Sequence, residues 1–189
     1  GNSILLPIII LVVLFLIGAA LLFWAYHKPK PTHTPGKPDT DAHRKLRQLI
    51  KTPLLQLEHL RGLESHVDFI EAQATDFVRI DPDYDGGVTG SMKIAHASEG
   101  FGLDVELHGP GPVRRHIMSA IRNTNYYEMG LLHPKVGPFQ PEIYSDGYRD
   151  GIDTVDENGC VEPPQGPGMG VEFNWDYINA HRTDTAVYE

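Results

Sequence analysis

The sequence predicts an α/β fold, with parallel strands alternating with helices, behind a single transmembrane helix. Three observations lead to this prediction: an apolar run near the N-terminus, an alternation of strand-like and helix-like segments after residue 39, and a polar residue after successive strands. The 189 residues provide room for one ordinary domain and an appendage.

The apolar run covers residues 4–26, which contain no charged side chain. About 20 apolar residues are enough to cross the roughly 30 Å hydrocarbon core of a bilayer. Trp24 and Tyr26 lie at the end of the run, where aromatic belts occur. A signal peptide is the alternative, but it would carry a basic residue before its apolar core, and residues 1–3 have none. We therefore expect residues 1–27 to be a membrane anchor.

The residues that follow the anchor predict its linker and its orientation. Residues 28–38 contain four prolines, which exclude a helix and favour an extended linker. Lysines and arginines follow the span and none precedes it, so the positive-inside rule predicts a single-pass protein with residues 39–189 in the cytoplasm. The net charge of −9 and the absence of a basic cluster exclude nucleic acid as the expected partner.

Residues 39–189 are predicted to form one domain of alternating elements. Apolar spacing predicts helices at 42–51, around 67–70, at 88–101 and at 113–122, and strands at 53–57, 76–80, 103–107 and 126–132. Pro112 suits the start of the last of these helices. Strands that alternate with helices at this spacing indicate parallel βαβ units.

The positions of the polar residues favour a barrel over an open sheet. Glu58, Asp81 and His108 each follow a strand, and Glu128 lies within the fourth. In a barrel, such strand ends converge on one mouth. An open nucleotide-binding sheet usually carries Gly-x-Gly-x-x-Gly, whereas residues 109–111 have only two glycines, and the prolines beside them cannot donate to a pyrophosphate. Four strands amount to half of an eight-stranded barrel.

Three segments carry a resemblance to a known family. Residues 55–59, 79–90 and 105–108 resemble strands five, six and seven of the mandelate racemase and acid-sugar dehydratase group of the enolase superfamily. The intervals of 23, 27 and 20 residues between Glu58, Asp81, His108 and Glu128 agree with the pattern of that group. Residues 166–172 resemble the close of its members. The resemblance implies that residues 39–189 form the C-terminal half of a (β/α) TIM-like barrel.

The resemblance also implies roles for the four residues. Glu58 would be one of three carboxylate ligands of Mg²⁺, and Asp81 and His108 would form a dyad in which His108 is the general base or acid. Glu128, as a protonated acid, would hydrogen-bond the substrate carboxylate. The chemistry is abstraction of the proton α to a carboxylate of a sugar acid or hydroxy acid, which needs a base and a means of stabilising the resulting enediolate.

Each of these positions also has a simpler interpretation. Glu58 and Glu128 could be surface charges, and Asp81 could belong to a turn-forming or solvated acidic loop with Asp83 and Asp85. Arg114 and Arg115 could reach an anionic substrate, but a solvated helix start is the expected role. The single cysteine, Cys160, follows a turn rich in carboxylates, which does not suit a nucleophilic thiol.

The resemblance places strands one to four, a capping domain, a lysine acid or base and two metal ligands outside this sequence. We therefore expect the isolated chain to bind Mg²⁺ weakly and to have only trace activity. Three explanations stay open: a truncated or chimeric product, a second chain that completes the barrel, or a membrane-tethered, catalytically inactive protein with a binding or structural role.

Overall fold

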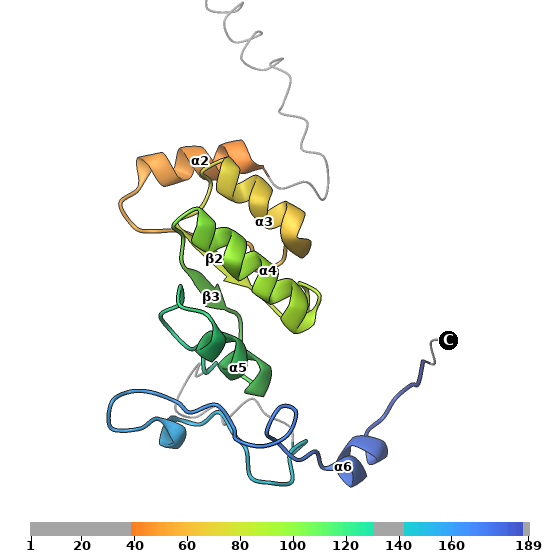
Figure 1. Ribbon diagram of the computed structural model, residues 1–189. Coiled ribbons are helices and arrows are strands. Elements are labelled where there is room, and N and C mark those ends of the chain that lie inside the picture. The colour runs from red at the N-terminus through yellow and green to blue at the C-terminus, as the bar shows by residue number, and fades with distance from the viewer. Residues whose placement is uncertain (1–38, 131–141, 187–189) are drawn as a thin grey trace, which may run out of the picture. The chain divides into compact units, whose positions relative to one another are not determined.

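The computed structural model describes residues 39–130 and 142–186. The first of these ranges holds a helix, α2 (Thr40–Leu49), and three strand–helix units. The units are β1 (Leu55–Gln56) with α3 (Gly62–Glu71), β2 (Phe77–Ile80) with α4 (Gly87–Gly100), and β3 (Val105–Leu107) with α5 (Pro112–Ala120). The three strands form a parallel sheet in the order β1-β2-β3, as the alternating pattern predicted (Figure 1).

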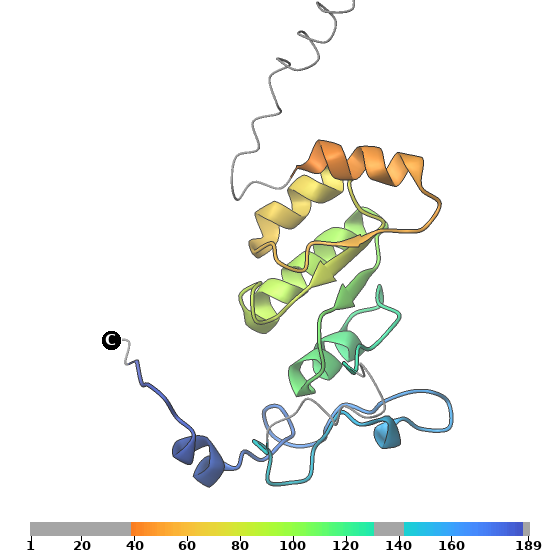
Figure 2. The same cartoon turned by 180° about the vertical axis from the view of Figure 1, so that it is seen from behind.

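Helices α3 and α4 cover one face of this sheet, and the view from behind shows the strands in front of them (Figure 2). The core lies between these layers and includes Val78, Ile80, Ile94, Val105 and Leu107, all at most 1% exposed. In the central strand β2 the buried Val78 and Ile80 alternate with half-buried residues, whereas all three residues of β3 are buried.

The turn between β2 and α4 depends on glycine. Gly86 and Gly87 have φ angles of 79° and 68°, a left-handed conformation that side chains rarely adopt. A Cβ atom on Gly90 would lie 1.6 Å from the carbonyl oxygen of Asp85, so only glycine fits there. These glycines let the chain reverse immediately after the acidic segment at residues 81–85.

Residues 142–186 follow a mostly irregular path. They include the 3₁₀ helix η1 (Ile152–Thr154), helix α6 (Trp175–Ala180) and one antiparallel bridge between Tyr144 and Phe173. The side chain of Asn174 caps α6 by accepting a hydrogen bond from the Tyr177 N–H at 3.0 Å.

The structure corrects the predicted fourth strand. Residues 126–130 form no strand, and the rest of the predicted range lies outside the described residues. The Tyr126 N–H donates to the Glu106 carboxylate at 3.0 Å, so a side chain takes the place of a ladder partner. A backbone hydrogen bond to β3 occurs earlier in the chain, where the Val105 N–H donates to the Asn123 carbonyl at 2.7 Å.

The predicted anchor at residues 4–26 also lies outside the described residues. Within 39–130 and 142–186, no helix combines the length and hydropathy that a membrane crossing requires. The anchor therefore stays a prediction.

Candidate active site

Asp81 and His108 form a hydrogen-bonded pair at the ends of β2 and β3. The register pairs Ile80 with Leu107, so the next residues along both strands are neighbours. His108 Nδ1 lies 2.8 Å from Asp81 Oδ2, and the His108 N–H donates to the Ile80 carbonyl at 2.8 Å. The Asp81 side chain is 4% exposed and that of His108 is 33% exposed. A buried carboxylate that accepts from Nδ1–H leaves Nε2 as the nitrogen available for proton transfer.

Arg114 holds the other oxygen of Asp81. Its Nη2 donates to Asp81 Oδ1 at 3.1 Å and to Asp83 Oδ2 at 2.7 Å, and its Nε donates to the His108 carbonyl at 3.0 Å. The prediction of a solvated helix start is therefore wrong for Arg114, because this guanidinium connects α5 to both members of the dyad. Its fork of donors suits such a bridge, whereas a lysine could not make all three bonds.

Asp85 lies beneath the dyad and is buried. Its Oδ2 accepts the Asp81 N–H at 2.9 Å, and its Oδ1 accepts the Gly62 N–H at 3.1 Å. The His66 ring, fully buried, lies with Nε2 3.8 Å from Asp85 Oδ2 and 3.1 Å from the Arg79 carbonyl, and with Nδ1 2.8 Å from the Gly62 carbonyl. The segment does form a turn, in which the Asp83 N–H donates to Asp81 Oδ1 at 2.9 Å. Of its three aspartates, however, only Asp83 is solvated, with a side chain that is 68% exposed, whereas Asp81 and Asp85 are buried.

Glu58, Arg79 and Glu128, here called the Arg79 cluster, lie beside His108. Glu58 Oε1 is 3.5 Å from His108 Nε2, and Glu58 Oε2 is 3.7 Å from Arg79 Nε. Arg79 Nη2 lies 2.5 Å from Glu128 Oε2, which also accepts the Gly109 N–H at 2.9 Å. The structure therefore brings all four predicted site residues together, although Glu128 reaches the site from irregular chain and not from a strand.

One residue of local irregularity explains the position of Glu58. Paired residues of β1 and β2, Leu55 with Phe77 and Gln56 with Val78, are 22 positions apart in the sequence. Glu58 and Asp81 are 23 positions apart. Leu57, between β1 and Glu58, has a φ of 96°, which is uncommon for a residue other than glycine. This turn ends β1 and lets the Glu58 carboxylate reach His108 Nε2.

A cavity of about 430 Å³, here called the site cavity, opens beside the dyad. Asp81 and His108 line one part of it, and Ile143, Met169 and Phe173 from the C-terminal segment line another. A polar wall opposite an apolar wall is typical of small-molecule sites, where a few polar groups orient the ligand.

Mg²⁺ prefers several oxygen ligands in octahedral geometry. Over residues 39–130 and 142–186, no three His, Cys, Asp or Glu side chains are grouped so that they could hold a metal ion. Glu58 alone does not make such a site, so the described residues do not fit the ion that the resemblance implies.

A second network, around Arg115, joins the C-terminal segment to α5. Arg115 donates to Asp150 Oδ1 from Nε at 3.1 Å and from Nη2 at 2.5 Å, and to the Glu162 carbonyl at 2.9 Å. The Tyr127 hydroxyl donates to the same Asp150 oxygen at 2.5 Å and accepts the Gly111 N–H at 2.8 Å. Because Arg115 is buried and fully engaged, the prediction that it is solvated is also wrong.

The environment of this network raises the pKa values of Tyr127 and Arg115. Burial, and next the hydrogen bond to the anionic Asp150, raise the pKa of Tyr127. Burial would lower the pKa of Arg115, but its hydrogen bonds and the Asp150 charge outweigh that effect, so its pKa is raised. The Tyr127 hydroxyl therefore stays neutral, and Arg115 keeps its charge.

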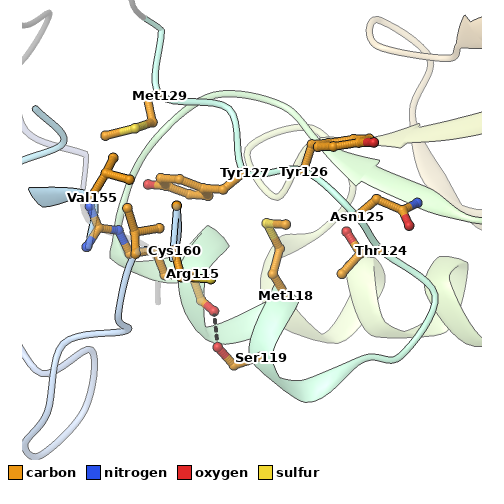
Figure 3. A pocket seen from close by; sticks show the side chains of 12 residues that line it. Arg115, Met118, Ser119, Thr124, Asn125, Tyr126, Tyr127, Met129, Val155 and Cys160 are labelled. Carbon is orange, nitrogen blue, oxygen red and sulfur yellow. Dashed lines mark hydrogen bonds between the residues drawn. The ribbon is translucent and has the colours of Figure 1, made fainter. Parts of the chain in front are cut away.

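A cavity of about 350 Å³ lies next to this network, and Figure 3 shows the side chains that line it. Its lining residues include Arg115, Met118, Tyr127, Met129, Val155 and Cys160. No His, Asp or Glu side chain lines it, so it lacks an acid–base pair of the kind found at the dyad.

Sequence reasoning missed Arg79, Asp85 and His66. Arg79 stands two residues before Asp81, on the same side of an alternating strand, and that spacing could have indicated it. Nothing in the local sequence separates the buried Asp85 from the exposed Asp83.

Residues 31–177 match the model of a family described as "Enolase C-terminal domain-like". A D-gluconate dehydratase from Thermoproteus tenax is 27% identical over 163 residues, which cover 84% of this chain and 31% of the relative. A D-galactonate dehydratase family member from Paenibacillus sp. (strain JDR-2) is 30% identical over 139 residues, or 70% of this chain and 32% of the relative.

Solved structures give the same similarity. The crystal structure of D-glucarate dehydratase from Agrobacterium tumefaciens complexed with magnesium is 28% identical, with a TM-score of 0.63. The similarity covers 77% of this chain and 38% of that protein. The chain thus spans about a third of the length of the curated relatives it matches.

Proposed function

The chain belongs to the enolase C-terminal domain-like family, and on that premise we propose that it contributes the acid–base side of an acid-sugar dehydratase or mandelate-racemase-type site. His108 moves the proton at the carbon α to a substrate carboxylate. The observation that carries the proposal is the 2.8 Å contact between His108 Nδ1 and Asp81 Oδ2 at the edge of the site cavity.

The geometry gives His108 a defined direction of transfer. Asp81 accepts a hydrogen bond from Nδ1–H of His108, so Nε2 is the basic atom. Asp81 is held in turn by Arg114, which donates to its carboxylate, and by Asp85, which accepts its backbone N–H. After proton uptake the imidazolium lies between Asp81 and Glu58. In a dehydration, the same imidazolium returns the proton to the departing β-hydroxyl group.

The substrate class and the metal belong to the proposal as well. Relatives whose names specify gluconate and galactonate dehydration support a sugar-acid or hydroxy-acid substrate, and the magnesium complex of the glucarate dehydratase supports a divalent ion. Because the described residues do not form a metal site, we propose that ligands from other residues, or from a second chain that completes the barrel, would be needed.

The test is exchange of the α-proton with solvent deuterium, followed by NMR across a panel of sugar acids. The full chain is measured alone and after co-expression with the N-terminal part of a related dehydratase, both with Mg²⁺ present. We expect trace exchange by the chain alone and restored exchange in the combined protein. His108→Asn should abolish that exchange, since general-base catalysis contributes about 10²–10⁴-fold. Exchange that survives this substitution would falsify the proposed role of His108.

A binding role without turnover is the second candidate. It is favoured by the lack of a three-ligand metal group among the described residues. Sugar acids that bind the combined protein, shift its NMR signals and undergo no exchange would support it over catalysis.

We also propose that residues 4–26 anchor the protein in a membrane as a single pass, with residues 39–189 in the cytoplasm. The uncharged apolar run and the basic residues that follow it support this location.

A further inference from the structure

Arg79 is the cation at the centre of the Arg79 cluster. It projects from β2 and lies within 4 Å of carboxylate oxygens of both Glu58 and Glu128. Its side chain is only 13% exposed. A guanidinium keeps its charge throughout the ordinary pH range and presents five N–H donors, so it can hold two carboxylates at once.

The hydrogen bonds at Glu128 show which group donates. Glu128 Oε2 accepts from Arg79 Nη2 at 2.5 Å and from the Gly109 N–H at 2.9 Å. An oxygen that accepts two N–H donors carries no proton of its own. Oε2 is therefore an acceptor in this contact, and the expectation that Glu128 donates to a substrate carboxylate stays a prediction.

Both oxygens of Glu58 also face nitrogen atoms. Oε1 is 3.5 Å from His108 Nε2 and Oε2 is 3.7 Å from Arg79 Nε. Arg79 Nε is a buried atom with no hydrogen-bond partner. A buried donor without a partner is unfavourable, and Glu58 Oε2, 3.7 Å away, is an anionic oxygen that could accept from it. A divalent ion would need these same carboxylate oxygens.

We infer that Arg79 is the resident cation of this site: it positions Glu58 and Glu128 and balances the charge that a divalent ion would balance at Glu58. Arg79 is a positioning residue, acting on the two carboxylates. The inference rests on the proposed function only in treating Glu58 as the position of a metal ligand. The inference explains why the site residues do not form a cation site by themselves, although three of the four are carboxylates. Each of these carboxylates already lies against an arginine or histidine nitrogen.

The experiment measures binding of Mn²⁺, a paramagnetic substitute for Mg²⁺, to the full chain in detergent by electron paramagnetic resonance. The parent should bind weakly, with half-saturation above about 10⁻⁴ M of Mn²⁺. This concentration is the lowest dissociation constant typical of the weaker class of protein cation sites. Arg79→Met removes the competing charge and should bind about tenfold more tightly, as expected for removing a unit charge a few ångströms from the ion. Arg79→Lys keeps a positive charge and should bind like the parent.

Two further variants locate the effect. Adding Glu58→Gln to Arg79→Met should abolish the gain, because the ion then loses its principal ligand. Arg122→Gln is the control variant, because Arg122 is 85% exposed and pairs with Glu99, which is not a member of the Arg79 cluster. This substitution should leave the affinity for Mn²⁺ unchanged. Circular dichroism before each titration establishes that the variant is folded.

Several results would overturn the inference. The first is a parent protein that binds Mn²⁺ as tightly as Arg79→Met does. The second is equal affinity of Arg79→Lys and Arg79→Met for Mn²⁺. The third is a gain in affinity from Arg79→Met that persists when Glu58→Gln is added. If Arg79→Met does not fold, parent half-saturation below about 10⁻⁴ M overturns the inference and weaker binding supports it. Because no turnover is measured, failure here is separate from failure of deuterium exchange, which depends on His108.

Discussion

Asp85 accepts the backbone N–H of Asp81 on its buried carboxylate, at 2.9 Å. The other oxygen of Asp85 accepts the Gly62 N–H at the start of α3, so one side chain fixes the end of β2 and the neighbouring helix together. Asp81, held in this way, presents its own carboxylate to His108. The dyad therefore depends on a residue that does not touch the site cavity.

Asp85→Asn should destabilise the protein and loosen the dyad. An asparagine amide has one acceptor oxygen, so either Asp81 or Gly62 would face an NH₂ group and lose its partner. A buried donor left unpaired costs about 1–3 kcal/mol, which urea unfolding would measure. Nitrogen-15 NMR should also show a less uniform His108 tautomer. Asp83→Asn, at an exposed position, is the control and should cost less than about 1 kcal/mol. Equal midpoints for Asp85→Asn and the parent would contradict this role.

Asp76 should give the protein acid sensitivity. Burial acts to raise its pKa, but the hydrogen bonds from the Leu54 N–H and from Arg47, with the Arg47 charge, outweigh burial and lower it. A lowered pKa in the folded state adds stability that is complete above the unfolded value, 3.8, and is lost as the pH falls through the folded value. Urea unfolding from pH 6 down to pH 3 should show this loss.

Asp76→Asn should remove that part of the pH dependence and cost about 1 kcal/mol near pH 6. Asp41→Asn is the matched control, because the Asp41 side chain is 72% exposed and pairs only across one turn of α2. A pH dependence that is the same in parent and Asp76→Asn would show that other carboxylates account for it.

The Tyr127 hydroxyl should hold the C-terminal segment on α5. It donates to Asp150 and accepts from Gly111, so Tyr127→Phe leaves the Gly111 N–H without its acceptor and removes one of the donors to Asp150, which keeps Arg115. We expect a loss of about 1–3 kcal/mol and faster proteolysis within residues 142–186. Tyr126→Phe, at a side chain that is 79% exposed, provides a neighbouring control and should change neither measurement. Similar cleavage rates for both variants would argue against this anchoring role.

Residues 4–26 should behave as a membrane anchor. Because an uncharged apolar run of this length spans a bilayer, the full chain should stay with membranes in alkaline carbonate and be released by detergent. A chain beginning at residue 39 is the comparison and should be extracted by carbonate. Release of the full chain by carbonate alone would exclude a spanning segment.

The sequence by itself determined the parallel strand–helix alternation and the meeting of Asp81 with His108. These follow from local geometry: apolar runs define β2 and β3, and the 27-residue interval is the register of the ladder, so residues just past the two strand ends must be neighbours. Glu58 followed from the same logic, with a shift of one residue at the left-handed Leu57.

The tertiary structure alone decided which charges pair. Asp83 and Asp85 are alike in sequence, yet one is exposed and one is buried, because only Asp85 lies within reach of the Asp81 and Gly62 N–H groups. Residues 126–130 have the composition of a strand, but the Glu106 and Glu128 side chains bond to backbone N–H groups where ladder bonds were expected. Apart from the bond between Asp81 and Asp85, these pairings join residues 19 to 23 positions apart, and periodicity along the chain carries no information about them.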